Sequence, residues 1–145
     1  MFRKVLVPID GSSHARMALD LALELLADED ASLVLLTVPE GSPTAADIVR
    51  WTGGASHGSD ADSVEAGIRR MLTDLEEKIA RPGLTVHSEL LWAPPAQAIL
   101  EMARTHDVEA IVMGSRGRSD LAGLVLGSTS HRVLHTADRR VIIVR

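Results

Sequence analysis

The sequence contains no cysteine. This absence excludes disulfide bonds, thiolate catalysis and zinc sites built on cysteine, and it fits a reducing compartment. Long hydrophobic runs are missing as well. The apolar stretch after Met1-Phe2-Arg3-Lys4 ends before Asp10, which is too short for the core of a signal peptide, and no other stretch could span a bilayer. We therefore expect a cytoplasmic protein without a membrane segment.

A basic excess is also missing from the chain. Its 15 lysines and arginines are outnumbered by 20 aspartates and glutamates, so the net charge is −5. Proteins that coat nucleic acids or anionic membranes carry a surplus of positive charge. We therefore predict neither nucleic acid nor membrane as a partner. The 145 residues suit one compact domain over residues 1–145, without an internal repeat or a domain boundary.

Short apolar runs alternate with stretches of helical periodicity along the chain. The runs predict strands at residues 5–9, 31–38, 84–91, 110–113 and 141–144. Helices are predicted from Ser12 or Ser13 to Leu26, over residues 62–80, from Pro94-Pro95 to about residue 105, and over residues 131–136. Five strands alternating with four helices are typical of an α/β fold with a parallel sheet and right-handed crossovers.

Two stretches are predicted to lie outside regular structure. Residues 39–59 are rich in Gly, Ser, Pro, Thr and Ala and lack periodicity, which favours a mobile or functional loop with Trp51 as its one large anchor. His57 in this loop has no partner at metal spacing, so we predict no metal site there. His106-Asp107 is expected to be a solvated turn at the end of a helix.

The most informative pattern is Gly114-Ser115-Arg116-Gly117, followed by nine residues and then Gly127-Ser128-Thr129-Ser130. Glycines after a strand let the backbone turn sharply and approach a ligand closely. The free N–H groups of a helix N-terminus then bind anionic oxygens, and the hydroxyls add donors, with Ser128 as a good N-cap. The pattern predicts a phosphate site. The alternative is an ordinary surface turn before a capped helix.

A crevice is expected beside this phosphate site. In open α/β sheets a ligand binds at the carboxyl ends of the strands, where the strand order reverses. If the first strand lies beside the fourth, Pro8, Ile9, Asp10, Gly11 and Ser12 flank this point on one side, and Met113-Gly114 flank it on the other. The second strand ends nearby at Val38. A nucleotide is the ligand that this arrangement favours.

Several side chains in the crevice have two interpretations. Asp10 could accept hydrogen bonds from a base or ribose, or hold Mg²⁺ through water, or it could form an Asx turn. Val38 and Met113 could enclose a planar base or belong to the core. Arg116 and Arg118 could neutralise phosphates or be solvated loop charges. His14, in the first turn of a helix, is expected to be exposed at the surface.

The segments Val5-Leu6-Val7-Pro8-Ile9-Asp10-Gly11-Ser12 and Ile111-Val112-Met113-Gly114-Ser115-Arg116-Gly117, with Gly127-Ser128, resemble the universal stress protein family. The spacing of the glycines resembles that of the branch that binds ATP. The resemblance covers nearly the whole chain except residues 39–59. It implies a Rossmann-like open parallel sheet of order 3-2-1-4-5 with helices on both faces, ATP or another adenine nucleotide with Mg²⁺, and a homodimer.

The family resemblance also implies roles for individual residues. Pro8, Asp10 and Val38 would contact the adenosine, while Met113, Gly114 and Gly117 would line the ribose and phosphates. The phosphates would be held by Gly127, Ser128, Thr129 and Ser130. One departure from the family is Arg139-Arg140, where members often have Cys-Pro; this alters the approach to the last strand and not the nucleotide site.

The implied function is that of a nucleotide-dependent regulatory module in the stress response, with slow or no ATP hydrolysis and an unknown regulatory protein as partner. The glycine-rich segment has no lysine, which a P-loop would require, so we predict no catalytic residue. One alternative is an enzyme acting at the α-phosphate, although Asp10-Gly11-Ser12-Ser13 matches poorly the Ser-Gly-Gly loop of such enzymes. Another is a dimeric interaction protein without nucleotide.

The sequence also gives an argument for the homodimer that does not depend on the resemblance alone. In the implied strand order the last strand lies at an edge, and Val141-Ile142-Ile143-Val144 has neither proline nor charge to protect it. Pairing with the same strand of a second copy about a two-fold axis would cover this edge.

Overall fold

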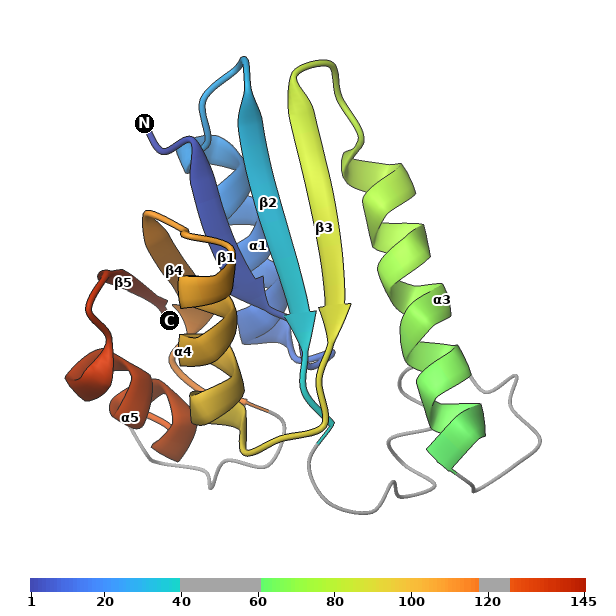
Figure 1. Cartoon of the computed structure of the whole chain (residues 1–145), viewed down its shortest axis with the longest axis vertical. Coiled ribbons are helices and arrows are strands. Elements are labelled where there is room, and N and C mark those ends of the chain that lie inside the picture. Colours follow the sequence, from blue (N-terminus) through green and yellow to red (C-terminus); the bar gives the residue numbers. More distant parts are fainter. Residues whose placement is uncertain (40–60, 118–125) are drawn as a thin grey trace.

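A computed structural model describes residues 1–39, 61–117 and 126–145. Its strands are β1 (Lys4–Pro8), β2 (Ala31–Thr37), β3 (Leu84–Leu90), β4 (Ala110–Gly114) and β5 (Arg140–Val144). Its helices are α1 (Ser13–Leu25), α3 (Ala61–Ile79), α4 (Pro95–Thr105) and α5 (Ser128–Thr136). All strand pairs are parallel, in the order β3-β2-β1-β4-β5, which confirms the predicted topology (Figure 1).

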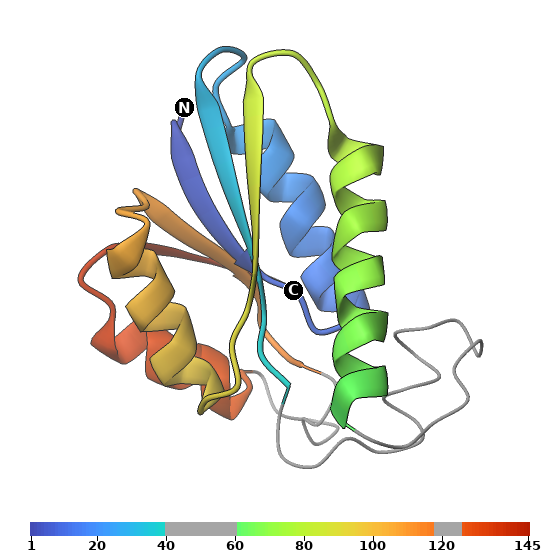
Figure 2. The same ribbon diagram turned by 45° about the vertical axis from the view of Figure 1, so that its right-hand side comes forward.

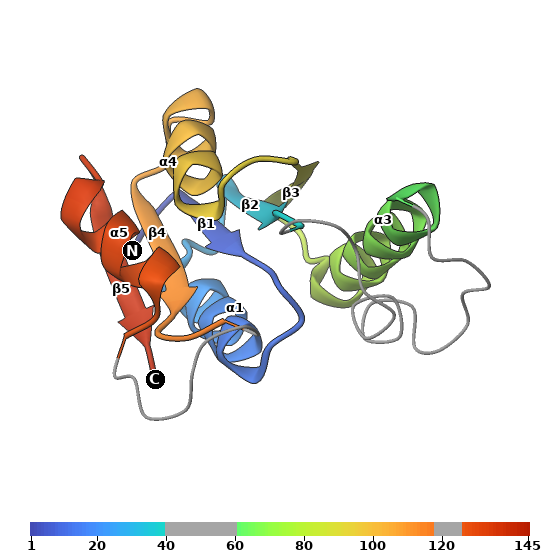
Figure 3. The same cartoon turned by 90° about the horizontal axis from the view of Figure 1, so that it is seen from below.

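Helices cover both faces of this sheet. Helices α1 and α3 lie on one face, and α4 and α5 lie on the other, as the turned views show (Figures 2 and 3). Each face has its own core: Leu19 of α1 and Ile68 of α3 pack on the first, and Ile99 of α4 and Val133 of α5 pack on the second. The central strand β1 contributes to both, because its residues alternate between the two faces. Because both faces of β1 are covered, its residues are apolar without alternation.

Helix α1 buries one apolar stripe, made of Ala15, Ala18, Leu19 and Ala22. On the opposite side Arg16 and Asp20 form an exposed ion pair at 3.5 Å. Ser12 is the N-cap, since its hydroxyl oxygen accepts a hydrogen bond from the N–H of Ala15 at 3.1 Å. The hydrophobic period of 3.6 residues and the capping residue together determine where this helix begins and which face it buries.

Strands β1 and β4 separate at Pro8. The N–H of Glu109 donates to the carbonyl of Lys4 at 2.9 Å, so the backbone of Lys4 faces β4. Alternate residues face the same neighbour, which means that Pro8 also faces β4 but has no N–H to donate. The register between β1 and β4 ends at Leu6 with Ile111, whereas β1 stays paired with β2 as far as Pro8. The pairing of β1 with β4 therefore ends before Pro8, at the point where the strand order reverses.

Two predictions about helix ends are wrong. Helix α5 begins at Ser128 and not at residue 131, and its N-cap is Gly127, without a side-chain hydrogen bond. Ser128 is therefore the first helical residue and not the cap. His106 is not part of a solvated turn, because its side chain is only 18% exposed and its Nε2 lies 3.0 Å from a carboxylate oxygen of Glu89 on β3. Asp107 is exposed as predicted.

Some predictions fall outside the part of the chain that the structure describes. These are the loop after Pro39 as far as residue 59, with Trp51 and His57, and Arg118 in the glycine-rich segment. Among the residues that are described, no helix is long and apolar enough to cross a membrane.

Candidate functional site

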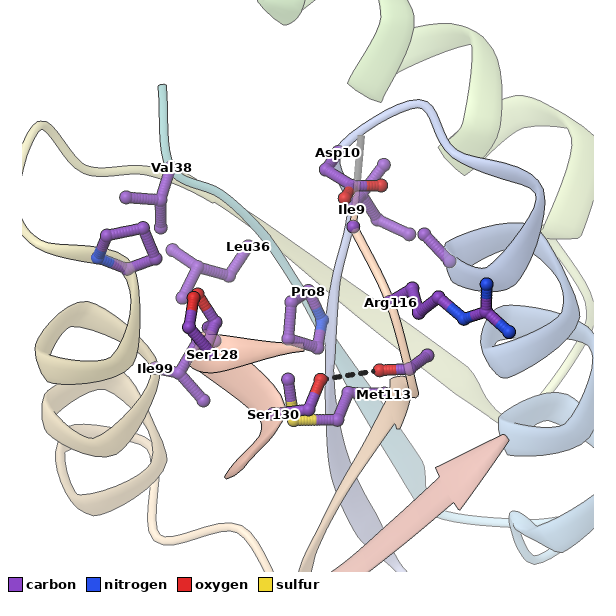
Figure 4. A pocket seen from close by; sticks show the side chains of 15 residues that line it. Pro8, Ile9, Asp10, Leu36, Val38, Ile99, Met113, Arg116, Ser128 and Ser130 are labelled. Carbon is purple, nitrogen blue, oxygen red and sulfur yellow. Dashed lines mark hydrogen bonds between the residues drawn. The ribbon is translucent and has the colours of Figure 1, made fainter. Parts of the chain in front are cut away.

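A cleft of about 140 Å³ lies where β1 and β4 separate (Figure 4). The carboxyl ends of β1, β2 and β4 meet here with the beginnings of α1, α4 and α5. Ligands of open α/β sheets bind in this position. The structure brings together most of the predicted site residues, which line the cleft: Pro8, Ile9, Asp10, Val38, Met113, Gly114, Arg116, Gly117, Ser128, Thr129 and Ser130.

The first turn of α5 offers backbone donors to the cleft. The first intrahelical bond runs from the N–H of His131 to the carbonyl of Gly127, at 2.9 Å. The N–H groups of Ser128, Thr129 and Ser130 precede it and have no partner within the helix, and no other described residue bonds them. The N-cap residue, Gly127, makes no side-chain capping bond. These three amides, at the positive end of a helix dipole, form a site for an anion.

Helix α1 differs in this respect from α5. The Ser12 hydroxyl already occupies the N–H of Ala15, and the Oδ1 of Asp10 accepts the N–H of Ser12 at 2.8 Å. Gly11, with φ of 79°, supplies the left-handed residue between Asp10 and Ser12. The Asx turn that was the alternative for Asp10 is therefore present. Ser12 caps its helix and does not line the cleft.

Two of the predicted phosphate donors are used inside the protein. The N–H of Gly127 donates to the carbonyl of Ser115 at 2.6 Å, and Gly127 is not among the residues that line the cleft. The Ser130 hydroxyl donates to the carbonyl of Gly114 at 2.8 Å, so its proton is not available to a ligand (Figure 4). Both bonds tie the start of α5 to the end of β4. The donors left for a ligand are thus the amides of Ser128, Thr129 and Ser130 and the hydroxyls of Ser128 and Thr129.

The packing against helix α1 also requires a glycine at position 114. A Cβ built on Gly114 would lie 2.6 Å from the Cβ of His14 and 2.9 Å from its carbonyl carbon. The close approach is therefore to helix α1 and not only to a ligand. His14 is half-buried against this glycine, so the prediction that it is exposed is wrong.

The two sides of the cleft differ in polarity. Leu36, Val38 and Ile99 form an apolar side, and Asp10 lies across from them, as Figure 4 shows. Met113 lies deep between the sides and is buried. Arg116 reaches the rim, but its guanidinium extends toward α1, away from Ser128 (Figure 4). Its Nε is buried and has no hydrogen-bond partner within the described segments.

Sequence reasoning missed four residues that line the cleft: Ala15, Leu36, Pro95 and Ile99. Leu36 could have been found, because residues two apart in a strand share a face and Val38 was already a candidate. Pro95 and Ile99 belong to α4, whose place beside the cleft depends on tertiary packing. No signal in the sequence indicated their position.

Comparisons with known proteins agree with this geometry. A model of the universal stress protein family matches residues 1–145. Universal stress protein YxiE of Bacillus subtilis is 35% identical over 148 aligned residues, which cover 100% of both chains. The solved structure of MJ0577 from Methanocaldococcus jannaschii shares the fold, with a TM-score of 0.79 and 22% identity over 99% of this chain and 96% of that one.

A crystal structure of a universal stress protein in complex with cAMP is also similar. Its TM-score is 0.64 and its identity is 25%, over 99% of this chain and 97% of that one. The full-length match to the family model and the identity to YxiE leave one assignment. The chain belongs to the universal stress protein family.

Proposed function

We propose that this protein binds an adenine nucleotide, with ATP and Mg²⁺ as the physiological ligands, and acts as a nucleotide-dependent regulatory module in the stress response. One observation carries the proposal: the uncapped amides of Ser128, Thr129 and Ser130 open into a cleft at the point where the strand order reverses. An uncapped helix N-terminus in such a cleft suits a phosphate chain.

The rest of the cleft suits the nucleoside. The apolar side of Leu36, Val38 and Ile99 offers a surface for a planar base, and Asp10 opposite offers carboxylate oxygens to its N–H groups or to ribose hydroxyls. The related protein solved with cAMP supports an adenine nucleotide as the ligand class. Val38 and Met113 then contact the base and ribose, while Gly114 and Gly117 lie along the phosphates.

Mg²⁺ fits this site only together with the phosphates. Over residues 1–39, 61–117 and 126–145 there is no group of three or more His, Cys, Asp or Glu that could hold a metal ion. Mg²⁺ in nucleotide sites is typically bound by one or two carboxylates, waters and substrate phosphates. Asp10 is the carboxylate that the described part of the chain contributes to the cleft, and it would contact the ion through water.

The chemistry of the cleft favours holding ATP over cleaving it. The segment from Gly114 to Ser130 contains no lysine that could reach the β- and γ-phosphates. With slow or absent hydrolysis, the complex with ATP lasts long enough for a partner protein to bind it. A second copy of the chain is the other partner in this proposal, paired through β5.

The direct test is a charge at the first residue of α5. An aspartate in the first turn of a helix is favourable to the helix but repels a phosphate. We expect Ser128→Asp to remain folded and to lose ATP affinity by about tenfold or more, the equivalent of about 1.4 kcal/mol in calorimetry. Ser128→Asn is the matched neutral control. Adenosine, which has no phosphate, should bind both variants equally.

A second test identifies the nucleotide that the purified protein releases when it is denatured. Recovery of ATP or AMP agrees with the proposal. If the native protein releases no nucleotide and gives no calorimetric signal with Mg-ATP, the proposed function is wrong.

A further inference from the structure

Helix α5 contains a second feature that nucleotide binding does not use. His131 and His135 are four residues apart and lie on the same side of the helix, about 6 Å apart along its axis. Their ring centroids are 4.4 Å apart and their planes are tilted by 47°. Both residues are exposed to solvent, whereas Val133 between them is buried in the core. The pair therefore lies on the outer face of α5.

The ring nitrogens of this pair are available. Neither imidazole makes a hydrogen bond or an ion pair with any residue that the structure describes. His87 and His106 also lie near each other, with ring centroids 5.6 Å apart, but the Nε2 of His106 already contacts Glu89. Two imidazoles on successive turns of a helix are a recurrent arrangement for metal ligation. A rigid helix holds them together before the metal arrives, which reduces the entropy cost of chelation.

We propose that His131 and His135 form a two-imidazole site for a first-row transition-metal dication. Imidazole suits Cu²⁺, Ni²⁺ and Zn²⁺, whereas Mg²⁺ and Ca²⁺ prefer oxygen ligands. No third His, Cys, Asp or Glu completes the group among the described residues. The remaining coordination positions are therefore filled by water or by a ligand from outside the chain. The expected affinity follows the usual order, with Cu²⁺ above Ni²⁺ and Zn²⁺.

This metal site is independent of the proposed nucleotide site. The imidazoles are not among the residues that line the cleft. The metal experiment is done without nucleotide, because phosphates would compete for the ion. Failure of one proposal therefore leaves the other intact.

The test uses the untagged full chain and Cu²⁺ as the probe. Wild type should bind one Cu²⁺ with an electron paramagnetic resonance spectrum of two nitrogen ligands, and amide signals of α5 should broaden selectively in NMR spectra. His131→Asn and His135→Asn should each lower the affinity by about tenfold or more, the scale of loss when ligand support is removed. His87→Asn, another exposed histidine, is the matched control and should bind Cu²⁺ like wild type.

Stability gives a second measurement for this site. Zn²⁺ that binds only the native state raises the melting temperature by mass action, so a rise is expected for wild type and His87→Asn but not for His135→Asn. Circular dichroism checks that each variant is folded. The proposal is overturned if the α5 variants bind Cu²⁺ as tightly as wild type, if the broadening centres outside α5, or if His87→Asn loses the same affinity.

Discussion

At the scale of single residues, Gly114 has a packing role that its place in a glycine motif conceals. The space where its Cβ would be is filled by the Cβ and carbonyl carbon of His14, atoms that every residue except glycine would place there. A methyl group at 114 must push α1 away from β4. We expect Gly114→Ala to lower the free energy of unfolding by about 1–3 kcal/mol, measured by urea denaturation.

The control for this substitution is Gly117→Ala, at an exposed position of the same segment. Its effect on stability should be smaller, whatever it does to nucleotide binding. Truncating the imidazole in His14→Ala should not rescue Gly114→Ala, because the clashing atoms remain. Equal stability of the Gly114 variant and wild type would mean that α1 and β4 are not packed as described.

Ser128 and Ser130 illustrate how adjacent hydroxyls can have different roles. Ser130 is buried and donates to the Gly114 carbonyl, so Ser130→Ala leaves this acceptor without a partner and should cost about 1–3 kcal/mol of stability. Ser128 makes no capping bond, and Ser128→Ala should change stability by less than about 0.5 kcal/mol. Thermal denaturation of the two variants compares them directly. The reverse order of effects would contradict the assigned bonds.

This pair of serines also marks the limit of sequence reasoning about the site. The sequence predicts that Ser128, Thr129 and Ser130 belong to the site, and in the structure all three line the cleft. It does not reveal which hydroxyl is already bonded. That depends on the distance from Ser130 to the end of β4, set by the packing of α5. Ser12 shows the same limit, because its hydroxyl caps α1 and it does not line the cleft.

At the scale of elements, Glu109 joins the start of β1 to the start of β4. Its carboxylate accepts the N–H of Arg3 at 2.5 Å and that of Lys4 at 3.2 Å. These backbone hydrogen bonds, with the charges of Arg140 and Arg3, hold the pKa of Glu109 below its usual value. A depressed folded-state pKa contributes stability above the unfolded pKa, and this contribution is lost as the pH falls through the folded pKa.

We therefore expect Glu109→Gln to destabilise the protein at neutral pH and to have little effect in acid, where the wild-type carboxyl is protonated. Urea denaturation of both proteins across this range measures the difference. Glu101→Gln, an exposed change on α4, controls for the general effect of removing one negative charge. A destabilisation that is independent of pH would show that the ionised form of Glu109 is not what joins the two strands.

Elements with a strong period were predictable, and those that depend on backbone contacts were less so. The periodicity of the apolar residues predicted the helix α1, and its buried face runs from Ala15 to Leu26 because burial follows the helical period directly. The prediction places the start of α5 three residues late, and it treats Ser128, the first helical residue, as the cap. Gly127 takes that position with extended backbone angles because its N–H is held by Ser115.

At the scale of the whole molecule, the strand order determines both where the cleft lies and which strands are edges. The cleft opens between β1 and β4 because the chain leaves the sheet in opposite directions there and Pro8 cannot continue the pairing. The same order leaves β3 and β5 paired on one side only. Strand β3 carries polar residues, including His87 and Glu89. The edge of β5 is apolar, with Val141 through Val144 half-buried.

The proposed dimer makes a prediction that uses the direction of individual peptide groups. The Val144 carbonyl accepts the N–H of Ser115 at 2.7 Å, so Val144 and Ile142 face β4, and Ile143 between them faces away from the sheet. Ile143→Pro removes an outward N–H that a second copy would need, without removing a bond to β4. Ile143→Ala loses side-chain contacts but keeps the N–H. Sedimentation at micromolar concentration should therefore give a dimer for wild type and Ile143→Ala and a monomer for Ile143→Pro. A dimer that survives Ile143→Pro would place the interface elsewhere, and a monomeric wild type would remove this dimer from the proposal.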